Sequence, residues 1–154
     1  KSVPGAMKKY RFGFEPWGLL LFLVVMLPNL IWFAVPAPND ILREGPAGGF
    51  VDSAASVFQI LMAAALCLLV NRERGPLRLT PLIFAAGGCV LLYYAGWAWY
   101  YMAFTGPPVI VLLTLPPCLA FAFFTIDRRN FVAVLAVSAF TLCHLTSAAV
   151  HFIL

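Results

Sequence analysis

Three side chains with reactive groups recur on one face of the last apolar segment of this 154-residue chain. His144, Ser147 and His151 follow the i, i+3, i+7 spacing that brings side chains to one side of a helix. No buried carboxylate stands in the sequence to orient a histidine base beside the serine, as a hydrolase would need. The histidines lie two turns apart on one helix, so they cannot bind a haem from both sides. We expect no catalytic residue and no cofactor, and rank an enzyme below a binding protein or a subunit.

A metal ion is a second chemistry that these histidines could serve. With Asp40, Glu44 or Asp52 from the preceding loop, His144 and His151 supply suitable ligand types, but the path of that loop does not follow from the sequence. We therefore assign no metal ligands. The cysteines lie within apolar runs and form no C-x-x-C pair, which argues against a zinc ribbon, a disulfide framework or a dithiol redox centre. They are Cys67, Cys89, Cys118 and Cys143.

The stretch LLYYAGWAWYY, residues 91–101, concentrates aromatic rings in an otherwise aliphatic segment. Counted from Phe104, the rings of Trp99, Tyr100 and Tyr101 lie within about 8 Å of the segment's end. Aromatic side chains commonly gather at that depth, where hydrocarbon meets headgroups. The membrane boundary therefore explains these three rings.

The inner rings of the stretch need another explanation. Trp97 lies about 10 Å deep and Tyr93 and Tyr94 about 15 Å deep, where no water reaches a phenol hydroxyl and an unpaired one is costly. Tyr93, Trp97 and Tyr100 also share one helix face. We predict that Tyr93, Tyr94, Trp97 and Tyr100 wall a pocket, with Tyr100 approaching headgroup level.

Hydrogen-bonding side chains occur in the other apolar segments at comparable depths. Asn29 lies about 9 Å, Gln59 about 12 Å and Thr114 about 10 Å below the outer ends of their segments. His144 lies about 15 Å deep, and Ser147 shares its face. Polar residues in a membrane tend to face a bundle interior or a cavity. Two interpretations remain, a ligand pocket and a set of hydrogen bonds that hold the helices together, and we favour the pocket.

The elements that position these residues follow from composition. The chain is 63% hydrophobic and 10% charged, too few charges to cover a soluble domain. A helix needs about 20 apolar residues to cross about 30 Å of hydrocarbon. We predict an all-α fold, an integral membrane bundle of five transmembrane helices in one domain. The predicted spans are about 17–35, 51–70, 81–104, 107–126 and 131–154.

The distribution of charge predicts the orientation. Basic residues cluster before the first span, between the second and third, and between the fourth and fifth: Lys8, Lys9, Arg11, Arg72, Arg74, Arg78, Arg128 and Arg129. The positive-inside rule therefore places the N-terminus in the cytoplasm and the C-terminus outside, in a multi-pass protein of the cell membrane. The net charge of +4 then reports topology and indicates no nucleic-acid partner. Residues 1–6 are expected to be a cloning remnant before a start at Met7, which leaves the membrane domain at 7–154.

Three local patterns refine the bundle. Pro116 and Pro117 predict a kink or break in the fourth helix, because each ring removes a backbone donor. FAAGGC (84–89) and MAAALC (62–67) predict seams where helices approach closely. In the long outer loop, NDILRE (39–44) predicts one helical turn, in a segment that either covers a site or only connects two helices.

In length, number of apolar segments and tryptophan content, the chain resembles the translocator protein (tryptophan-rich sensory protein) family. The likeness is architectural: that family's tryptophan- and proline-rich motifs do not occur at matching positions, so no residue role carries over. The resemblance implies that so small a bundle can enclose a hydrophobic ligand.

We therefore expect a membrane protein that binds a small apolar or cationic organic molecule in an outward-opening pocket lined by aromatic rings, with transport or sensing as further roles that the sequence leaves open. Ring faces attract cations, by about 2 kcal/mol when desolvated. The expected ligand-binding residues are Asn29, Gln59, Tyr93, Tyr94, Trp97, Tyr100, Thr114, His144 and Ser147. The alternative is a ligand-free subunit or homo-oligomer whose aromatic face packs against another membrane protein.

Overall fold

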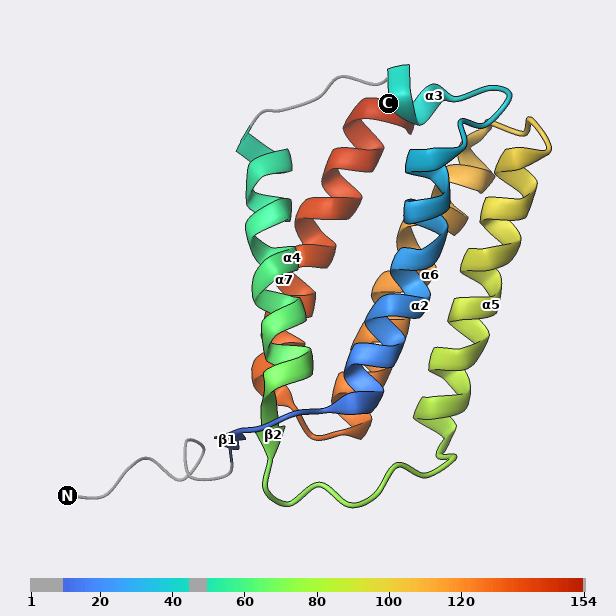
Figure 1. The fold of residues 1–154 in the computed structure, drawn as a ribbon. Coiled ribbons are helices and arrows are strands. Elements are labelled where there is room, and N and C mark those ends of the chain that lie inside the picture. The colour runs from blue at the N-terminus through green and yellow to red at the C-terminus, as the bar shows by residue number, and fades with distance from the viewer. Residues whose placement is uncertain (1–9, 45–49, 154) are drawn as a thin grey trace.

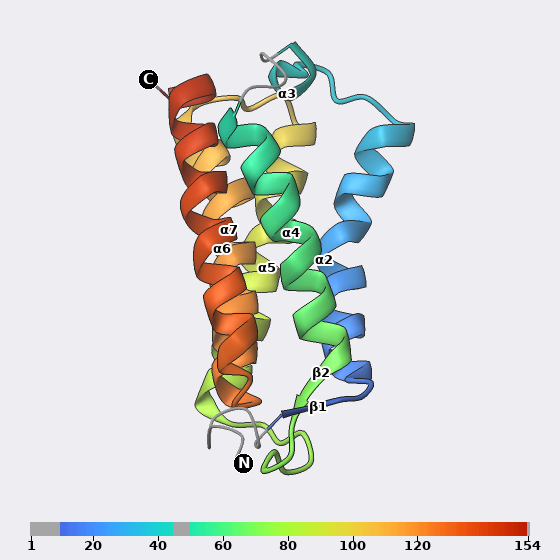
Figure 2. The same ribbon diagram turned by 90° about the vertical axis from the view of Figure 1, so that its left-hand side faces the viewer.

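The structure is a computed structural model that describes residues 10–44 and 50–153. Within them the long helices lie side by side in one bundle (Figures 1 and 2): α2 (Pro16–Ala34), α4 (Phe50–Leu68), α5 (Pro81–Tyr101), α6 (Pro107–Asp127) and α7 (Phe131–Ala148). A wider turn, η1 (Ala149–Ile153), continues α7, and a single turn, α3 (Ile41–Glu44), follows α2, as NDILRE predicted. Residues 1–6 and Leu154, both named in the sequence predictions, lie outside the described part.

The all-α prediction is confirmed. In the described residues α2, α5, α6 and α7 with η1 are long and apolar enough to cross a membrane. The helix that corresponds to the second predicted span, α4, is apolar over a shorter stretch, Asp52–Leu68.

The helices begin where the local sequence favours it. Pro16, Pro81 and Pro107 occupy first-turn positions, where a missing backbone donor costs nothing. The Thr80 hydroxyl accepts a hydrogen bond from the backbone of Ile83, and the Asn130 side chain caps α7 in the same way. These signals explain why the predicted starts agree with the helices to within one or two residues.

The second apolar run does not stay helical to Val70. It ends as a strand, β2 (Leu69–Asn71), which pairs antiparallel with β1 (Tyr10–Phe12). The backbone N–H groups of Gly13 and Glu15 donate to the carbonyls of Leu68 and Cys67, 2.9 and 2.8 Å away. These bonds satisfy carbonyls that the end of α4 leaves free, so the chain before α2 replaces the next helical turn.

The third and fourth predicted spans also differ from the helices. Ala103 has a left-handed backbone with φ 74°, which ends α5 at Tyr101, so depths counted from Phe104 start too far out. In contrast, α6 is one helix that passes through Pro116 and Pro117, so it is not broken there. Both prolines are buried among neighbouring helices, a setting in which membrane helices tolerate proline.

Two glycines lie where helices approach closely. A Cβ atom on Gly18 of α2 would lie 2.5 Å from the Leu66 carbonyl oxygen of α4, and one on Gly96 of α5 would lie 2.8 Å from Cβ of Leu112 on α6. The seam predicted at 84–89 is therefore wrong at its glycines. Gly87 and Gly88 are exposed, and a Cβ on either would meet nothing within 4 Å.

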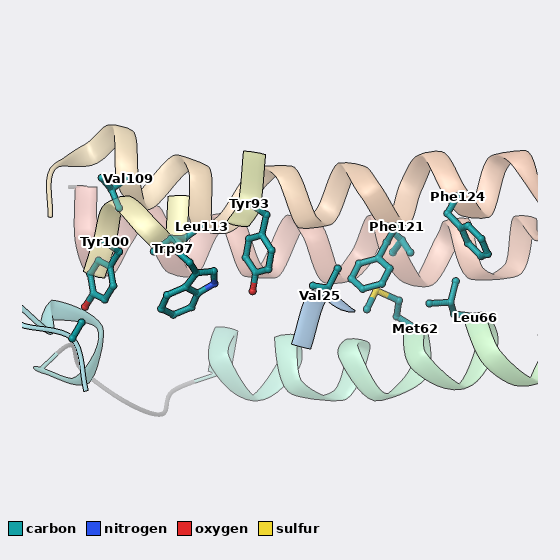
Figure 3. Packing of buried hydrophobic residues seen from close by; sticks show 12 residues of the cluster. Val25, Met62, Leu66, Tyr93, Trp97, Tyr100, Val109, Leu113, Phe121 and Phe124 are labelled. Carbon is teal, nitrogen blue, oxygen red and sulfur yellow. The ribbon is translucent and has the colours of Figure 1, made fainter. Parts of the chain in front are cut away.

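The bundle has two different ends, named here the β end, with β1 and β2, and the α3 end. Near the β end α2 and α4 touch at Gly18, and toward the α3 end they diverge (Figure 2). The buried apolar cluster runs along the interior from Tyr100 near α3 to Leu66 and Phe124 near the β end (Figure 3).

Charged groups close the β end. The Arg128 guanidinium donates to the Glu15 carboxylate over 3.0 Å, and both side chains are 4% exposed. Arg74 approaches the same carboxylate to 3.5 Å. The Asn130 amide donates to the carbonyls of Ala65 and Leu69, each 2.9 Å away. Sequence reasoning used Arg128 only as a topology signal and did not anticipate its buried partner.

Candidate functional site

A cavity of about 400 Å³ lies among the five long helices, toward the α3 end. Its wall extends from Phe121 and Met62 near the middle of the bundle to Leu42 of α3 and Phe152 of η1. Seven of the nine predicted residues line it, one or two from each long helix. They are Asn29, Gln59, Tyr93, Trp97, Thr114, His144 and Ser147.

Tyr94 and Tyr100 do not line the cavity. Tyr94 follows Tyr93 by about 100° around the helix, and its hydroxyl donates to the carbonyl of Val24 on α2. The hydroxyl of Tyr100 donates to Asp40 at 2.8 Å and accepts from the backbone of Leu42 at 3.1 Å.

Tyr100 is enclosed by the protein itself, and its predicted position at headgroup level stays a prediction. This residue has no exposed surface, because the chain after α2 folds over the end of α5. Trp99 is 37% exposed on the outer face, as expected of a boundary residue. Tyr101 donates to the carbonyl of Val35, so three of the four tyrosines in the stretch bond α2 or the residue after it.

Helix-to-helix hydrogen bonds account for only part of the cavity's polar groups. The Asn29 amide donates to the Tyr93 hydroxyl over 3.1 Å and so links α2 to α5. The Gln59 amide reaches only the Met26 thioether, 3.7 Å away and a weak acceptor. Thr114 bonds the Ile110 carbonyl of its own helix. Gln59 and Thr114 therefore contribute little to holding the helices together.

Trp97 is a buried ring of the wall that contacts several other rings. It is 6% exposed, and its centroid lies 6.4 Å from Tyr93, 5.7 Å from Tyr100 and 6.3 Å from Trp32. Figure 3 shows Trp97 and Tyr93 pointing from α5 toward the space above α4. The indole Nε1 is buried and has no hydrogen-bond partner among the described residues. A buried donor without a partner costs about 1–3 kcal/mol, which a ligand with an acceptor atom would recover.

Asp52 is a wall residue that the sequence predictions placed at the start of the second span and considered only as a possible metal ligand. It lies in the first turn of α4 and accepts a hydrogen bond from the Ser147 hydroxyl of α7. The spacing Asp52, Ser56, Gln59 is i, i+4, i+7, the signal by which one face of α4 could have been recognised. All three side chains line the cavity.

Within the described residues, the surroundings of the histidines match neither a hydrolytic triad nor a three-ligand metal site. Ser147 lies 3.4 Å from Nδ1 of His151, but the carboxylate of Asp52 bonds the serine and not the histidine, unlike a hydrolytic triad. His144 stacks on Phe140 with ring centroids 5.1 Å apart. Among the described residues no three His, Cys, Asp or Glu side chains lie close enough to hold a metal ion. The side chain of Glu44, one of the alternative ligands, is outside the described part.

Asp40 fastens α3 across the end of the bundle. Its carboxylate accepts from Trp32 Nε1, Tyr100 and Arg43 Nε, each over 2.8 Å. Burial raises the pKa of this carboxyl, but hydrogen bonds, first from Trp32 and then from Tyr100, Ala37 and Arg43, outweigh it and hold the pKa below its usual 3.8. Arg43 also lies 4.3 Å above the Trp32 ring and bonds the Trp32 carbonyl. Because Leu42 lines the cavity, the fastened turn forms its cover.

The mouth of the cavity lies between α2 and α4. Phe33 of α2 and Ser56 of α4 both line the cavity and are exposed, Phe33 to 67%. This is the side on which the two helices diverge (Figure 2).

Comparisons with protein-family models, with curated proteins and with solved structures found no match. The site is therefore interpreted from its own residues.

Proposed function

We propose that this chain is a five-span protein of the cell membrane that binds, and by binding transports or senses, a small apolar or cationic organic molecule in the cavity. The observation that carries the proposal is the convergence of polar side chains from every long helix on one mainly apolar cavity whose wall includes several aromatic rings. A few convergent polar groups in an apolar pocket are the usual composition of a small-molecule site.

The membrane topology rests on the lengths of the helices and on the charge asymmetry. Four helices are long enough to span, and α4, with 19 residues, measures about 28 Å, so we count it as the fifth span. Arg11 and Arg72 lie exposed at the β end, which we assign to the cytoplasm.

Cysteine labelling in intact cells tests this topology. A membrane-impermeant maleimide should label Pro46→Cys without permeabilisation and Pro76→Cys only after it. The reverse pattern would place the cavity mouth toward the cytoplasm.

Ligand binding is tested with two probes of one shape, the neutral tert-butylbenzene and the cationic phenyltrimethylammonium. At least one should raise the melting temperature of the wild-type protein in nanodiscs. Trp97→Ala should abolish that rise, because Trp97 forms the enclosed wall of the cavity. Trp99→Ala is the matched control, since Trp99 lies two residues away on the exposed face of α5 and should keep the full response. If Trp97→Ala lowers the intrinsic melting temperature but keeps the probe response, the ligand site is not this cavity.

The alternative, a ligand-free subunit that packs through its aromatic face, has less support. Tyr93 and Trp97 are buried within the chain itself, 3% and 6% exposed, so they offer no surface to a partner. A wild-type protein that responds to neither probe and forms a stable oligomer would favour the subunit.

A further inference from the structure

We infer that the cavity selects organic cations, with Asp52 as the counter-ion for the charged group. This inference rests on the proposed ligand-binding function and names its ligand class. The ligand would be an ammonium or similar cation with an apolar body, which lies among Phe22, Met62 and Phe121 in the inner part of the cavity.

The first support is an uncompensated negative charge. Among the described residues, Asp52 is the one acidic residue in the cavity wall, and no lysine or arginine lines that wall. Arg43 is the only basic residue between positions 12 and 71, and its guanidinium is bound to Asp40 and to the Trp32 carbonyl. No ion pair involves Asp52 among the described residues, and Ser147 occupies one of its several acceptor positions. A cationic ligand would balance this charge.

The second support is the aromatic wall. Trp32, Tyr93 and Trp97 all line the cavity, and ring faces attract cations most strongly where water is excluded. The protein already uses one of these rings in this way, since Arg43 lies 4.3 Å above the centre of Trp32. The carboxylate and the rings therefore favour the same charge, and the cavity offers both.

The third support is independent of charge. Trp97 lines the cavity and is only 6% exposed, and its indole N–H has no hydrogen-bond partner among the described residues. A wall that existed only to pack helices would satisfy this donor or replace it with an apolar ring. The unmet donor indicates that the cavity is built for an occupant.

The experiment compares phenyltrimethylammonium with tert-butylbenzene, which differ only in the atom that bears the charge. Affinities are measured by tryptophan fluorescence and melting temperature for wild type, Asp52→Asn and Glu73→Gln. Asp52→Asn should weaken binding of the cation by about tenfold or more and leave binding of the neutral probe unchanged. Glu73→Gln removes an exposed acid at the β end, outside the cavity, and should change neither affinity.

Each result separates this inference from the proposed function. Equal binding of both probes, or equal loss of both in Asp52→Asn, overturns the cation inference and leaves a cavity that binds apolar ligands. Binding of neither probe to the wild-type protein overturns both. Comparing each probe across variants cancels its partitioning into lipid, and the neutral probe shows whether Asp52→Asn still forms the cavity.

Discussion

The two ends of the bundle differ in how their polar side chains are paired. At the β end, Glu15 meets Arg128 and Arg74, Asn130 caps two carbonyls, and Gly18 lets α2 touch α4. At the α3 end, helices diverge around a cavity, Asp52 lacks an ion-pair partner in the described residues, and the Trp97 donor is unmet. The β end therefore holds the buried ion pair of Glu15 and Arg128, whereas the α3 end holds the cavity beneath a turn that Asp40 fastens.

This contrast separates two roles that buried polar groups have in membrane bundles. A fully paired group fixes the arrangement of helices, whereas an unpaired group beside a cavity is directed at something not yet present. Substitutions at the β end should therefore lower the free energy of unfolding more than a substitution at the α3 end.

Arg128→Ala should have the largest effect on folding. It leaves the Glu15 carboxylate buried with only Arg74 nearby, and breaking such a pair costs about 3–5 kcal/mol. The free energy of unfolding, measured with denaturant in detergent micelles, should fall by that amount. The exposed Arg78→Ala is the control and should change it by less than about 0.5 kcal/mol. A loss as small as the control's would mean that the β end is not the stable one.

Gly18→Ala should have the second largest effect. The added Cβ would lie 2.5 Å from the Leu66 carbonyl oxygen, so α2 and α4 must separate, at a cost of about 1–3 kcal/mol. Gly87→Ala is the matched control, because its Cβ meets nothing within 4 Å. That substitution should stabilise the protein by up to about 1 kcal/mol, the gain in helix propensity. The same unfolding assay should therefore give changes of opposite sign for two identical substitutions.

Asp40→Asn should have the smallest effect, about 1 kcal/mol at pH 7, since it weakens charge-assisted hydrogen bonds but keeps an acceptor. Because hydrogen bonds hold the folded pKa of Asp40 below 3.8, its contribution is present above the unfolded value and is lost as pH falls through the folded one. Wild type and variant should therefore converge in free energy of unfolding between about pH 4 and the lowered pKa. A constant difference down to pH 3 would contradict the assignment of Asp40 as the fastening group.

Much of the fold follows from local sequence. Apolar run length predicts the long helices, and Thr80, Pro81 and Asn130 mark helix starts, because hydropathy and capping act within a few residues. The β1–β2 pair could not be foreseen, since it joins two short segments that α2, α3 and α4 separate in the chain. The end of α5 at Tyr101 depends on a single left-handed residue, Ala103, which carries no glycine signal.

The depth of a residue along a membrane helix can be predicted from the sequence, and to that extent the candidate site could be predicted. Counting residues along each helix brought Asn29, Gln59, Trp97 and His144 to a common level, and all four line the cavity. The rotation of each helix about its axis and the path of each loop depend on contacts far apart in the sequence, so residue counting does not predict them. Asp40 could not be linked to Tyr100 from sequence because the loop that carries it folds over α5.

The contact at Gly18, near the β end, is a point about which α2 can tilt. Ala34 lies 16 residues away, about 24 Å along the helix, so each degree of tilt moves that end by about 0.4 Å. Three tyrosine bonds resist the motion at increasing distance from this contact, Tyr94 at Val24, Tyr93 at Asn29 and Tyr101 at Val35. The farthest bond is stretched most by a given tilt and the nearest least. The bonds would therefore break in order from the α3 end. A tilt of α2 by a few degrees would open the mouth of the cavity while the bond of Tyr94 to Val24 remains.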